Sequence, residues 1–138
     1  MSDVLGGAVR RFLTDQSVGT IVTLRSDGRA RQTLVYYLLE GDRVVISTEA
    51  SRGKARDVER EPWASLCVMG HEKPWPSCTV EGPAQLLRKD VGAATASMLE
   101  KITGKRPDPA PTDEQLAAAG RVILALEIAR VYGVSYID

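Results

Sequence analysis

One short segment of the chain gathers hydroxyls, a glycine and three cations at the start of an expected helix. Ser47 and Thr48 end an expected strand, and the chain continues as Ser51-Arg52-Gly53-Lys54-Ala55-Arg56. A helix N-terminus presents unpaired backbone N–H groups and a partial positive charge, so hydroxyls and cations beside it can receive a phosphate. We expect Gly53 to let backbone and phosphate approach closely. The same residues also suit a capped, solvated basic helix start, and the residues alone leave both interpretations open.

The only histidine and the two cysteines are further candidates for chemistry. His71 follows an expected strand and precedes Glu72, where it could donate a proton or simply be an exposed loop residue. Cys67, His71 and Cys78 fit no compact zinc-finger spacing, and a fourth ligand is missing. We therefore expect no metal site, and we expect both cysteines to behave as small buried hydrophobic residues.

Trp75 stands between two prolines and is the most conspicuous aromatic residue of a loop. The sequence Pro74-Trp75-Pro76 predicts a rigid segment, which could cover a cofactor ring, contact a second copy of the chain or pack against the same chain. The residue type suits all three roles. For Trp63 we expect core packing.

Most of the elements that must position these residues are strands. Alternation and β-branched content predict strands over 19–25, 31–40, 43–48, 64–70, 77–87 and 121–137. Turns at 26–29 and 40–42 would make the first three an antiparallel meander. The continuously apolar run 64–70 predicts a strand buried on both faces, and Gly82-Pro83 predicts a bulge or edge. Six strands joined largely by hairpins indicate a mainly β chain, a small closed or split barrel rather than a sandwich.

Four helices are expected around this barrel. Apolar spacing predicts helices over 4–15, 51–61 and 90–103, and a short helix between Thr112 and Gly120. Ser51 is expected to cap the second helix, and Thr112 with Gln115 resembles a capping box for the last. Three prolines after position 106 predict an extended, exposed loop.

Composition narrows the function classes. The 138 residues are 43% hydrophobic, which suits a single domain over 1–138. The 18 basic and 18 acidic side chains balance, so no overall electrostatic field attracts nucleic acid or a membrane surface. No apolar run approaches the roughly 18 residues that a membrane helix needs. We expect a cytoplasmic protein with reduced cysteines.

Several tracts in this order resemble the pyridoxamine 5'-phosphate oxidase-like superfamily, particularly its small branch that binds the deazaflavin coenzyme F420. The tracts are GTIVTLRSDGRARQTLVYY, VVISTEASRGKARD, EPWASLCVMG, VEGPAQLL and RVYGV. The likeness covers most of the chain. It implies a split-barrel homodimer with two cofactor sites at the subunit interface, each built from both chains.

The resemblance also implies roles for individual residues. Gln32, Thr33 and Leu34 would lie along the tricyclic ring of the cofactor, with Ser47 and Thr48 following it. The phosphate would be held by Ser51, Arg52 and Lys54, with Arg56 as a second cation behind them. Asp57 and Val134 depart from the pattern, because many relatives have asparagine and tryptophan at these positions.

The implied function is that of a flavoprotein-like oxidoreductase that transfers a hydride from F420 to an activated C=C, C=N or C=O bond of a small molecule. No side chain is required as a nucleophile. The proton would come from solvent or from Tyr36 or Tyr37. Arg52, Lys54 and Arg56 could also serve the acidic tail that only the deazaflavin carries, unless Glu49, Asp57 and Glu59 neutralise them. The alternatives are an FMN-dependent enzyme of the same fold and a flavin-binding or haem-binding protein without turnover.

Overall fold

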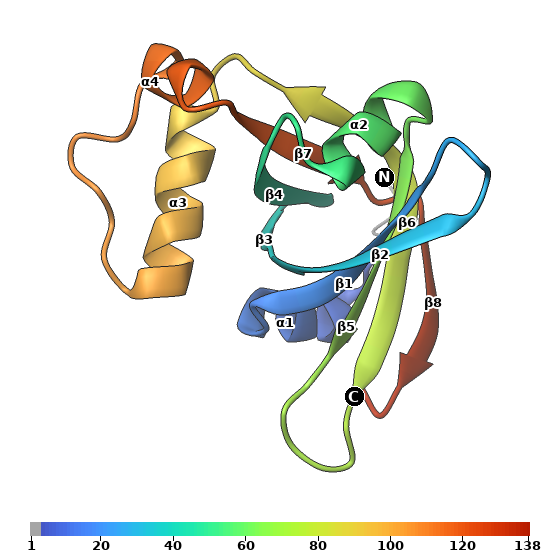
Figure 1. Ribbon diagram of the computed structural model, residues 1–138. Helices are drawn as coiled ribbons and strands as arrows, with labels where there is room; N and C mark the ends of the chain where they lie inside the picture. Colours follow the sequence, from blue (N-terminus) through green and yellow to red (C-terminus); the bar gives the residue numbers. More distant parts are fainter. Residues whose placement is uncertain (1–3) are drawn as a thin grey trace.

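The computed structural model describes residues 4–138 and consists of eight strands and four helices in the part described (Figure 1). In chain order they are α1 Gly7–Asp15, β1 Val18–Leu24, β2 Ala30–Tyr36, β3 Leu38–Glu40, β4 Arg43–Glu49, α2 Gly53–Arg60, β5 Trp63–Met69, β6 Ser77–Leu87, α3 Gly92–Thr103, α4 Asp113–Ala118, β7 Arg121–Glu127 and β8 Arg130–Ser135.

The strands form one antiparallel sheet that curls into a half-barrel. Their order is β2-β1-β5-β6-β7-β4-β3, and β8 pairs with β6 beside this path. The strands β2 and β3 lie at opposite ends of the order but follow each other in the chain through Tyr37, so the sheet must bend to bring its ends together. Figure 1 shows α1 below β1, α2 at the upper edge, and α3 standing apart from the curl on the side of β3 and β4.

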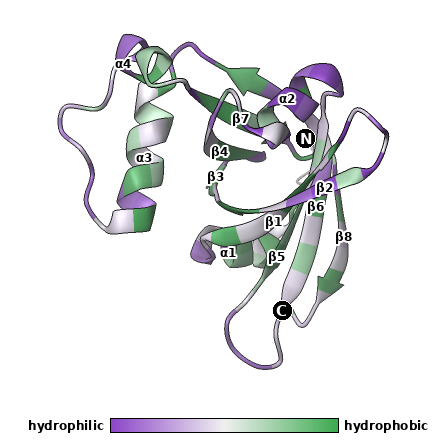
Figure 2. Cartoon of the chain, viewed as in Figure 1, coloured by the Kyte–Doolittle hydropathy of each residue, from purple (hydrophilic) through white to green (hydrophobic). Residues whose placement is uncertain are grey.

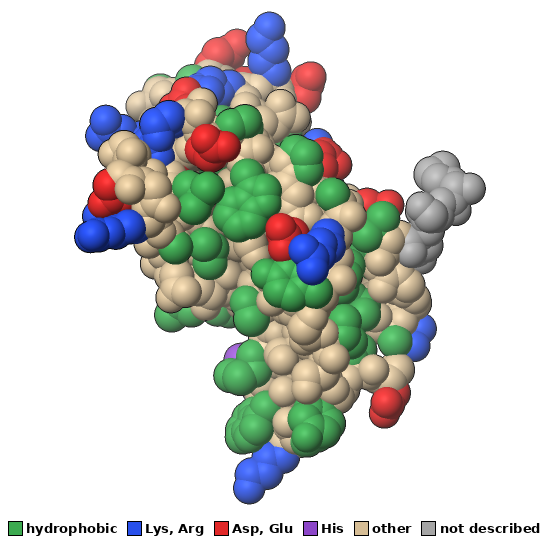
Figure 3. Space-filling view, turned by 90° about the vertical axis from the view of Figure 1, so that its right-hand side faces the viewer, with side chains coloured by type: hydrophobic (Ala, Val, Ile, Leu, Met, Phe, Trp, Pro, Cys, Tyr) green, Lys and Arg blue, Asp and Glu red, His purple; other side chains and the backbone are tan. Residues whose placement is uncertain are grey.

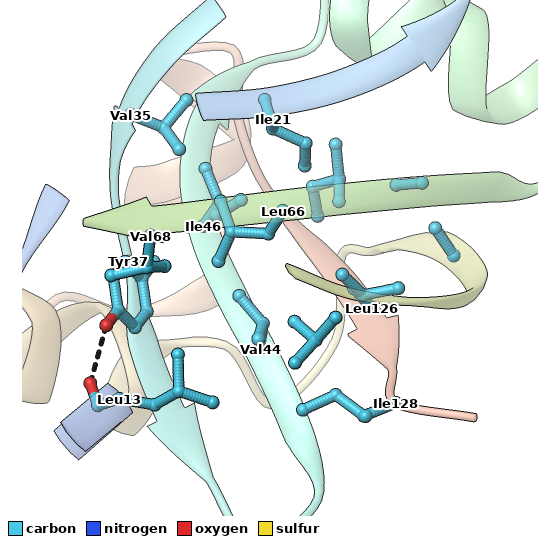
Figure 4. Packing of buried hydrophobic residues seen from close by; sticks show 14 of the residues in the cluster. Leu13, Ile21, Val35, Tyr37, Val44, Ile46, Leu66, Val68, Leu126 and Ile128 are labelled. Atoms are coloured by element: carbon cyan, nitrogen blue, oxygen red, sulfur yellow. Dashed lines mark hydrogen bonds between the residues drawn. The ribbon is translucent and has the colours of Figure 1, made fainter. Parts of the chain in front are cut away.

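Two expected strands are each divided in two. The run 31–40 becomes β2 and β3 because Tyr37 is fully buried, with its hydroxyl donating to the Leu13 carbonyl at 2.5 Å (Figure 4). The run 121–137 becomes β7 and β8, because the Ile128 and Ala129 N–H groups bond to Asp42 and Glu81 between them. The expected six strands are therefore eight. Both hairpins of the expected meander are present, but the middle strand is divided between them: β2 pairs with β1, and β3 pairs with β4.

β6 is the strand on which two parts of the sheet meet. Its first half pairs with β5 and β8, and its second half, from Ala84 to Leu87, pairs with β7. Gly82 lies at the change of partners, where a Cβ atom would be 2.0 Å from the Glu127 carbonyl oxygen. The sequence predicts a bulge or edge at Gly82-Pro83. Pairing with β5 is regular there, but on the other side of β6 the ladder is interrupted, since pairing with β8 ends at Glu81 and pairing with β7 begins at Ala84. The register shift lies between Ser77 and Thr79.

The core fills the inside of the curl, where the inward-facing side chains of the strands are apolar. Figure 4 shows side chains from the strands and from α1 converging there, among them Leu13, Ile21, Ile46, Leu66 and Leu126, all at most 1% exposed. β5 is buried on both faces only in its first half. Cys67 is exposed and Met69 is 57% exposed, which corrects the predicted burial of Cys67. Cys78 is buried as predicted, and burial raises the pKa of its thiol to about 11.

The helices follow the predictions with changes at their ends. α2 begins at Gly53, and its N-cap is Arg52 without a side-chain hydrogen bond, so the predicted cap at Ser51 is wrong. The capping box of Thr112 and Gln115 is present, and α3 ends at Gly104 with φ of 81° as predicted. In Figure 2 α2 is mostly hydrophilic and β7 mostly hydrophobic. Among residues 4–138 no helix has the length and apolarity to cross a membrane.

Candidate cofactor site

A polar cavity of about 480 Å³ lies between β2, the end of β4 and the start of α2. The outer ends of β2 and β4 approach here because the sheet curls, and the turn after β4 brings α2 over them. The lining residues supply hydroxyls, amides and cations: Arg31, Gln32, Thr33, Ser47, Thr48, Glu49, Arg52, Gly53, Lys54 and Arg121. Donors of this kind suit an anionic ligand such as a phosphate.

A larger and mainly apolar cavity of about 520 Å³ adjoins it. The wall away from the barrel comes from Met98, Leu99 and Ile102 of α3, and the barrel side includes Leu34 and Tyr36 of β2. The two cavities share Ser47, Lys54 and Arg121. Along β2 the residues 31–33 line the polar cavity and 34–36 the apolar one, so a ligand lying along this strand would pass from polar to apolar surroundings.

Lys54 stands at the junction of the two cavities. It has no hydrogen bond or ion pair to any side chain of residues 4–138, and it is partly buried. Burial lowers the pKa of the Lys54 ammonium, and the nearby charges of Arg52 and Arg121 lower it further. Since an unpaired, partly desolvated cation is costly, this position favours an anionic ligand.

Arg121 is a site residue that the sequence did not predict. It opens β7, and its guanidinium donates to the Ser47 hydroxyl at 2.8 Å. Its only carboxylate neighbour among the described residues is Glu49 at 3.9 Å, which lies closer to Arg52 at 3.5 Å. The residue enters the site because β4 and β7 pair in a register that places Arg121 opposite Glu49.

Asp57 of α2 links this helix to β1 and β2 beside the site. Its carboxylate is nearly fully buried and accepts hydrogen bonds from Thr23 at 2.8 Å, Arg31 at 2.7 Å and Arg60 at 3.4 Å. Burial alone would raise the pKa of Asp57, but the bonds from Arg31, Thr23 and Arg60 outweigh it and the pKa is lowered. A Cβ atom on Gly53 would lie 2.5 Å from Arg31 Cζ, so Gly53 makes room for this arginine.

A sequence profile described as pyridoxamine 5'-phosphate oxidase matches residues 5–135. The chain belongs to the pyridoxamine 5'-phosphate oxidase family. Its half-barrel is the split barrel of this family.

Solved structures with the same fold share little sequence with this member of the family. A conserved hypothetical protein from Mycobacterium tuberculosis aligns with a TM-score of 0.76 and 19% identity, over 95% of this chain and 86% of that one. A structure described as an F420 reductase aligns with a TM-score of 0.73 and 19% identity, over 89% of this chain and 94% of that one. A haem storage protein from Vibrio cholerae aligns with a TM-score of 0.72 and 12% identity, over 97% of this chain and 96% of that one. At these identities the comparisons show the fold.

The structure brings together all but one of the residues predicted to contact the cofactor. Ser51 and Arg56 line a third cavity of about 390 Å³, which shares Arg31 and Gly53 with the polar cavity. Each of the others lines the polar or the apolar cavity: Gln32, Thr33, Leu34, Ser47, Thr48, Arg52, Gly53 and Lys54. Trp75 is the exception. It is 48% exposed in the loop between β5 and β6, at the opposite end of the sheet from α2 (Figure 1).

The remaining candidates for chemistry lie away from these cavities. His71 is an exposed loop residue, and residues 4–138 contain no group of three side chains able to hold a metal ion. Tyr37 is fully buried, and burial raises the pKa of its hydroxyl. Of the two tyrosines considered as proton donors, only Tyr36 lines a cavity.

Proposed function

We propose that two copies of this chain form a dimer that holds coenzyme F420 and transfers a hydride to a small-molecule acceptor. The observation that carries the proposal is Lys54, an unpaired cation at the meeting point of a polar cavity and an apolar cavity. The F420 reductase among the similar structures is consistent with this cofactor.

The donor set fits the parts of such a cofactor. Lys54, Arg52 and the hydroxyls of Ser47 and Thr48 would hold the phosphate in the polar cavity. Gln32, Thr33 and Leu34 follow β2 from the polar to the apolar cavity, and the ring would lie along them. When bound, a deazaflavin supplies a hydride. The chain would bind and orient it, exclude water beneath α3, and present Tyr36 as a proton donor to the acceptor.

The third cavity supports F420 over FMN, because the F420 arm continues beyond its phosphate into carboxylates. Arg31 and Arg60 share the single carboxylate of Asp57, and Arg56 has no ion-pair partner among the described residues. Glu59 pairs with Arg88, at 3.7 Å, and so does not neutralise Arg56. The excess of positive charge would receive the acidic tail, whereas FMN would leave it unused.

The outer face of the sheet suits a second copy of the chain. Pairing places exposed Leu34 in one row with Thr20, Cys67, Thr79 and Tyr132 across β2, β1, β5, β6 and β8. Hydrophobic side chains spread over the side of the molecule that carries β8 (Figure 3). Exposed hydrophobic side chains on this face, among them Leu34, Met69 and Tyr132, would be buried by a second copy, and the cofactor would lie at the margin of the face beside Leu34.

Two alternatives use the same fold. An FMN-dependent enzyme would use the same polar cavity for its phosphate. A haem-binding protein is disfavoured, because His71 is the only histidine and lines none of the cavities described.

Titration of the purified chain with F420 and with FMN, followed by cofactor fluorescence at two salt concentrations, tests the proposal. We expect tighter and more salt-sensitive binding of F420, because its tail would engage exposed cations. Equal or tighter binding of FMN would move the chain to the FMN-dependent branch. If F420 binds, the next step is oxidation of bound reduced F420 by quinones, biliverdin or enones, and failure with every acceptor would favour a binding protein without turnover.

A further inference from the structure

The apolar cavity has a charged end whose charge the phosphate of the cofactor does not balance. Arg52, Lys54 and Arg121 line the two joined cavities, and Glu49 is the one carboxylate that lines them with these three. Arg31 lines the polar cavity too, but its charge is paired with Asp57. The phosphate of F420 is a diester with a single negative charge. One cation is therefore left over beside the apolar cavity.

Arg121 is the cation best placed to meet a second anion. It borders both cavities, its guanidinium is held in place by the bond to Ser47 at 2.8 Å, and its side chain is 36% exposed. The nearest carboxylate oxygen of the described residues, on Glu49, is 3.9 Å from the guanidinium, which is too far for a hydrogen bond. The guanidinium can therefore still bind another carboxylate. Arginine suits this task, because its planar group can bind a carboxylate with two hydrogen bonds.

The rest of the cavity selects an apolar body. Met98, Leu99 and Ile102 of α3 face Leu34 and Tyr36 of β2 across it, and on the α3 side Leu99 and Ile102 are still 39% and 37% exposed. A ligand that buried these side chains would gain hydrophobic stabilisation. The volume of about 520 Å³ is in the range of ordinary small-molecule sites.

This inference rests on the proposed function: we propose that the acceptor is an apolar molecule carrying an acidic group, and that Arg121 is the residue that selects the acid. The body of the acceptor lies between α3 and β2, and its acidic group lies beside Arg121, away from the phosphate of the cofactor.

Two dyes with the same ring system separate the acid from the apolar body. 8-Anilinonaphthalene-1-sulfonate carries an anion, and N-phenyl-1-naphthylamine does not. We would titrate both into the chain saturated with F420, by calorimetry, for the wild type and for Arg121→Gln, Arg121→Lys and Arg43→Gln. Arg43 is the control because it stands at the other end of the same β4–β7 ladder and borders none of the cavities described.

We expect the wild type to bind the anionic dye more tightly than the neutral one. Arg121→Gln should weaken the anionic dye about tenfold and leave the neutral dye unchanged, because one charge-assisted contact is lost. Arg121→Lys should recover part of that loss, and Arg43→Gln should change neither dye. As a second measurement, Ile102→Glu should weaken both dyes. Equal affinity of the wild type for the two dyes, equal weakening of both by Arg121→Gln, or binding of neither dye would overturn the inference. If F420 itself does not bind, the proposed function fails, and the same titrations on the unloaded chain still decide whether Arg121 selects an acid.

Discussion

At the scale of residues, Lys54 and Asp57 have opposite tasks although they lie three positions apart on α2. The Lys54 ammonium reaches outward to the junction of two cavities, without a partner among the described side chains. The Asp57 carboxylate points inward and binds β1 and β2 to the helix through Thr23 and Arg31. One residue therefore serves the ligand and the other serves the fold, and substitutions should separate the two effects.

Lys54→Glu should weaken binding of F420 by more than tenfold without unfolding the chain. The lost contact is a charge-assisted one, worth about 1.5 to 3 kcal/mol, and the side chain makes no bond that the fold needs. Fluorescence titration measures the affinity and circular dichroism the fold. Lys89→Glu makes the same change of charge at an exposed position and should leave affinity nearly unchanged. Equal losses in both variants would mean that only the overall charge matters.

Asp57→Asn should lower the free energy of unfolding at pH 7 by about 2 kcal/mol, because two charged hydrogen-bond donors lose their carboxylate. The folded-state pKa of Asp57 is lowered, so this stabilisation is present above the unfolded pKa of about 3.9 and is lost as the pH falls through the folded value. Urea unfolding over a range of pH measures this free energy for wild type and variant. The difference between their free energies of unfolding should become smaller in acid. Glu40→Gln removes a surface pair with Arg43 and should cost under about 1 kcal/mol. A difference that is constant with pH would contradict the assigned role of the carboxylate.

At the scale of elements, the crossing of β6 from one part of the sheet to the other depends on a position without a side chain. Gly82→Ala would place a Cβ atom 2.0 Å from the Glu127 carbonyl oxygen, which belongs to backbone and cannot turn aside. We expect a loss of at least about 3 kcal/mol in the free energy of unfolding. Gly104→Ala is the comparison, because no atom lies within 4 Å and only its φ of 81° is strained. It should cost about 1 to 2 kcal/mol in chemical unfolding. Similar losses in the free energy of unfolding at both positions would mean that the backbone near Glu127 moves to make room for the Cβ atom at position 82.

The sequence predicted the types of most elements and the two hairpins β1–β2 and β3–β4, but not the pairing of β1 with β5 or of β4 with β7. Helix ends and turns depend on neighbouring residues, which is why the capping box at Thr112 and the helix end at Gly104 were predicted correctly. The division of 31–40 at Tyr37 depends on Leu13 of α1, and that of 121–137 on Asp42 and Glu81. The site divides in the same way. Lys54 could be found from its local segment, whereas Arg121 meets Ser47 only through the register of β4 and β7, across 74 positions of sequence.

At the scale of the whole molecule, the apolar outer face predicts a dimer. Static light scattering should report twice the chain mass of 15.0 kDa. Met69→Glu should shift the chain toward monomer, because Met69 is 57% exposed on β5 and a charge there would be buried between copies. Gln85→Glu adds the same charge at an exposed position further along β6 and should leave the mass unchanged. Wild-type chain that stays monomeric at micromolar concentration would remove the interface on which the proposed cofactor site depends.

The place of β7 in the sheet has a consequence for synthesis on the ribosome. β7 lies between β6 and β4, although it is made long after both. Until its residues emerge, the two older strands each have an edge without a partner, and the nascent chain cannot close its core. Folding must therefore wait for nearly the whole chain, which favours slow folding and a need for protection from aggregation during translation.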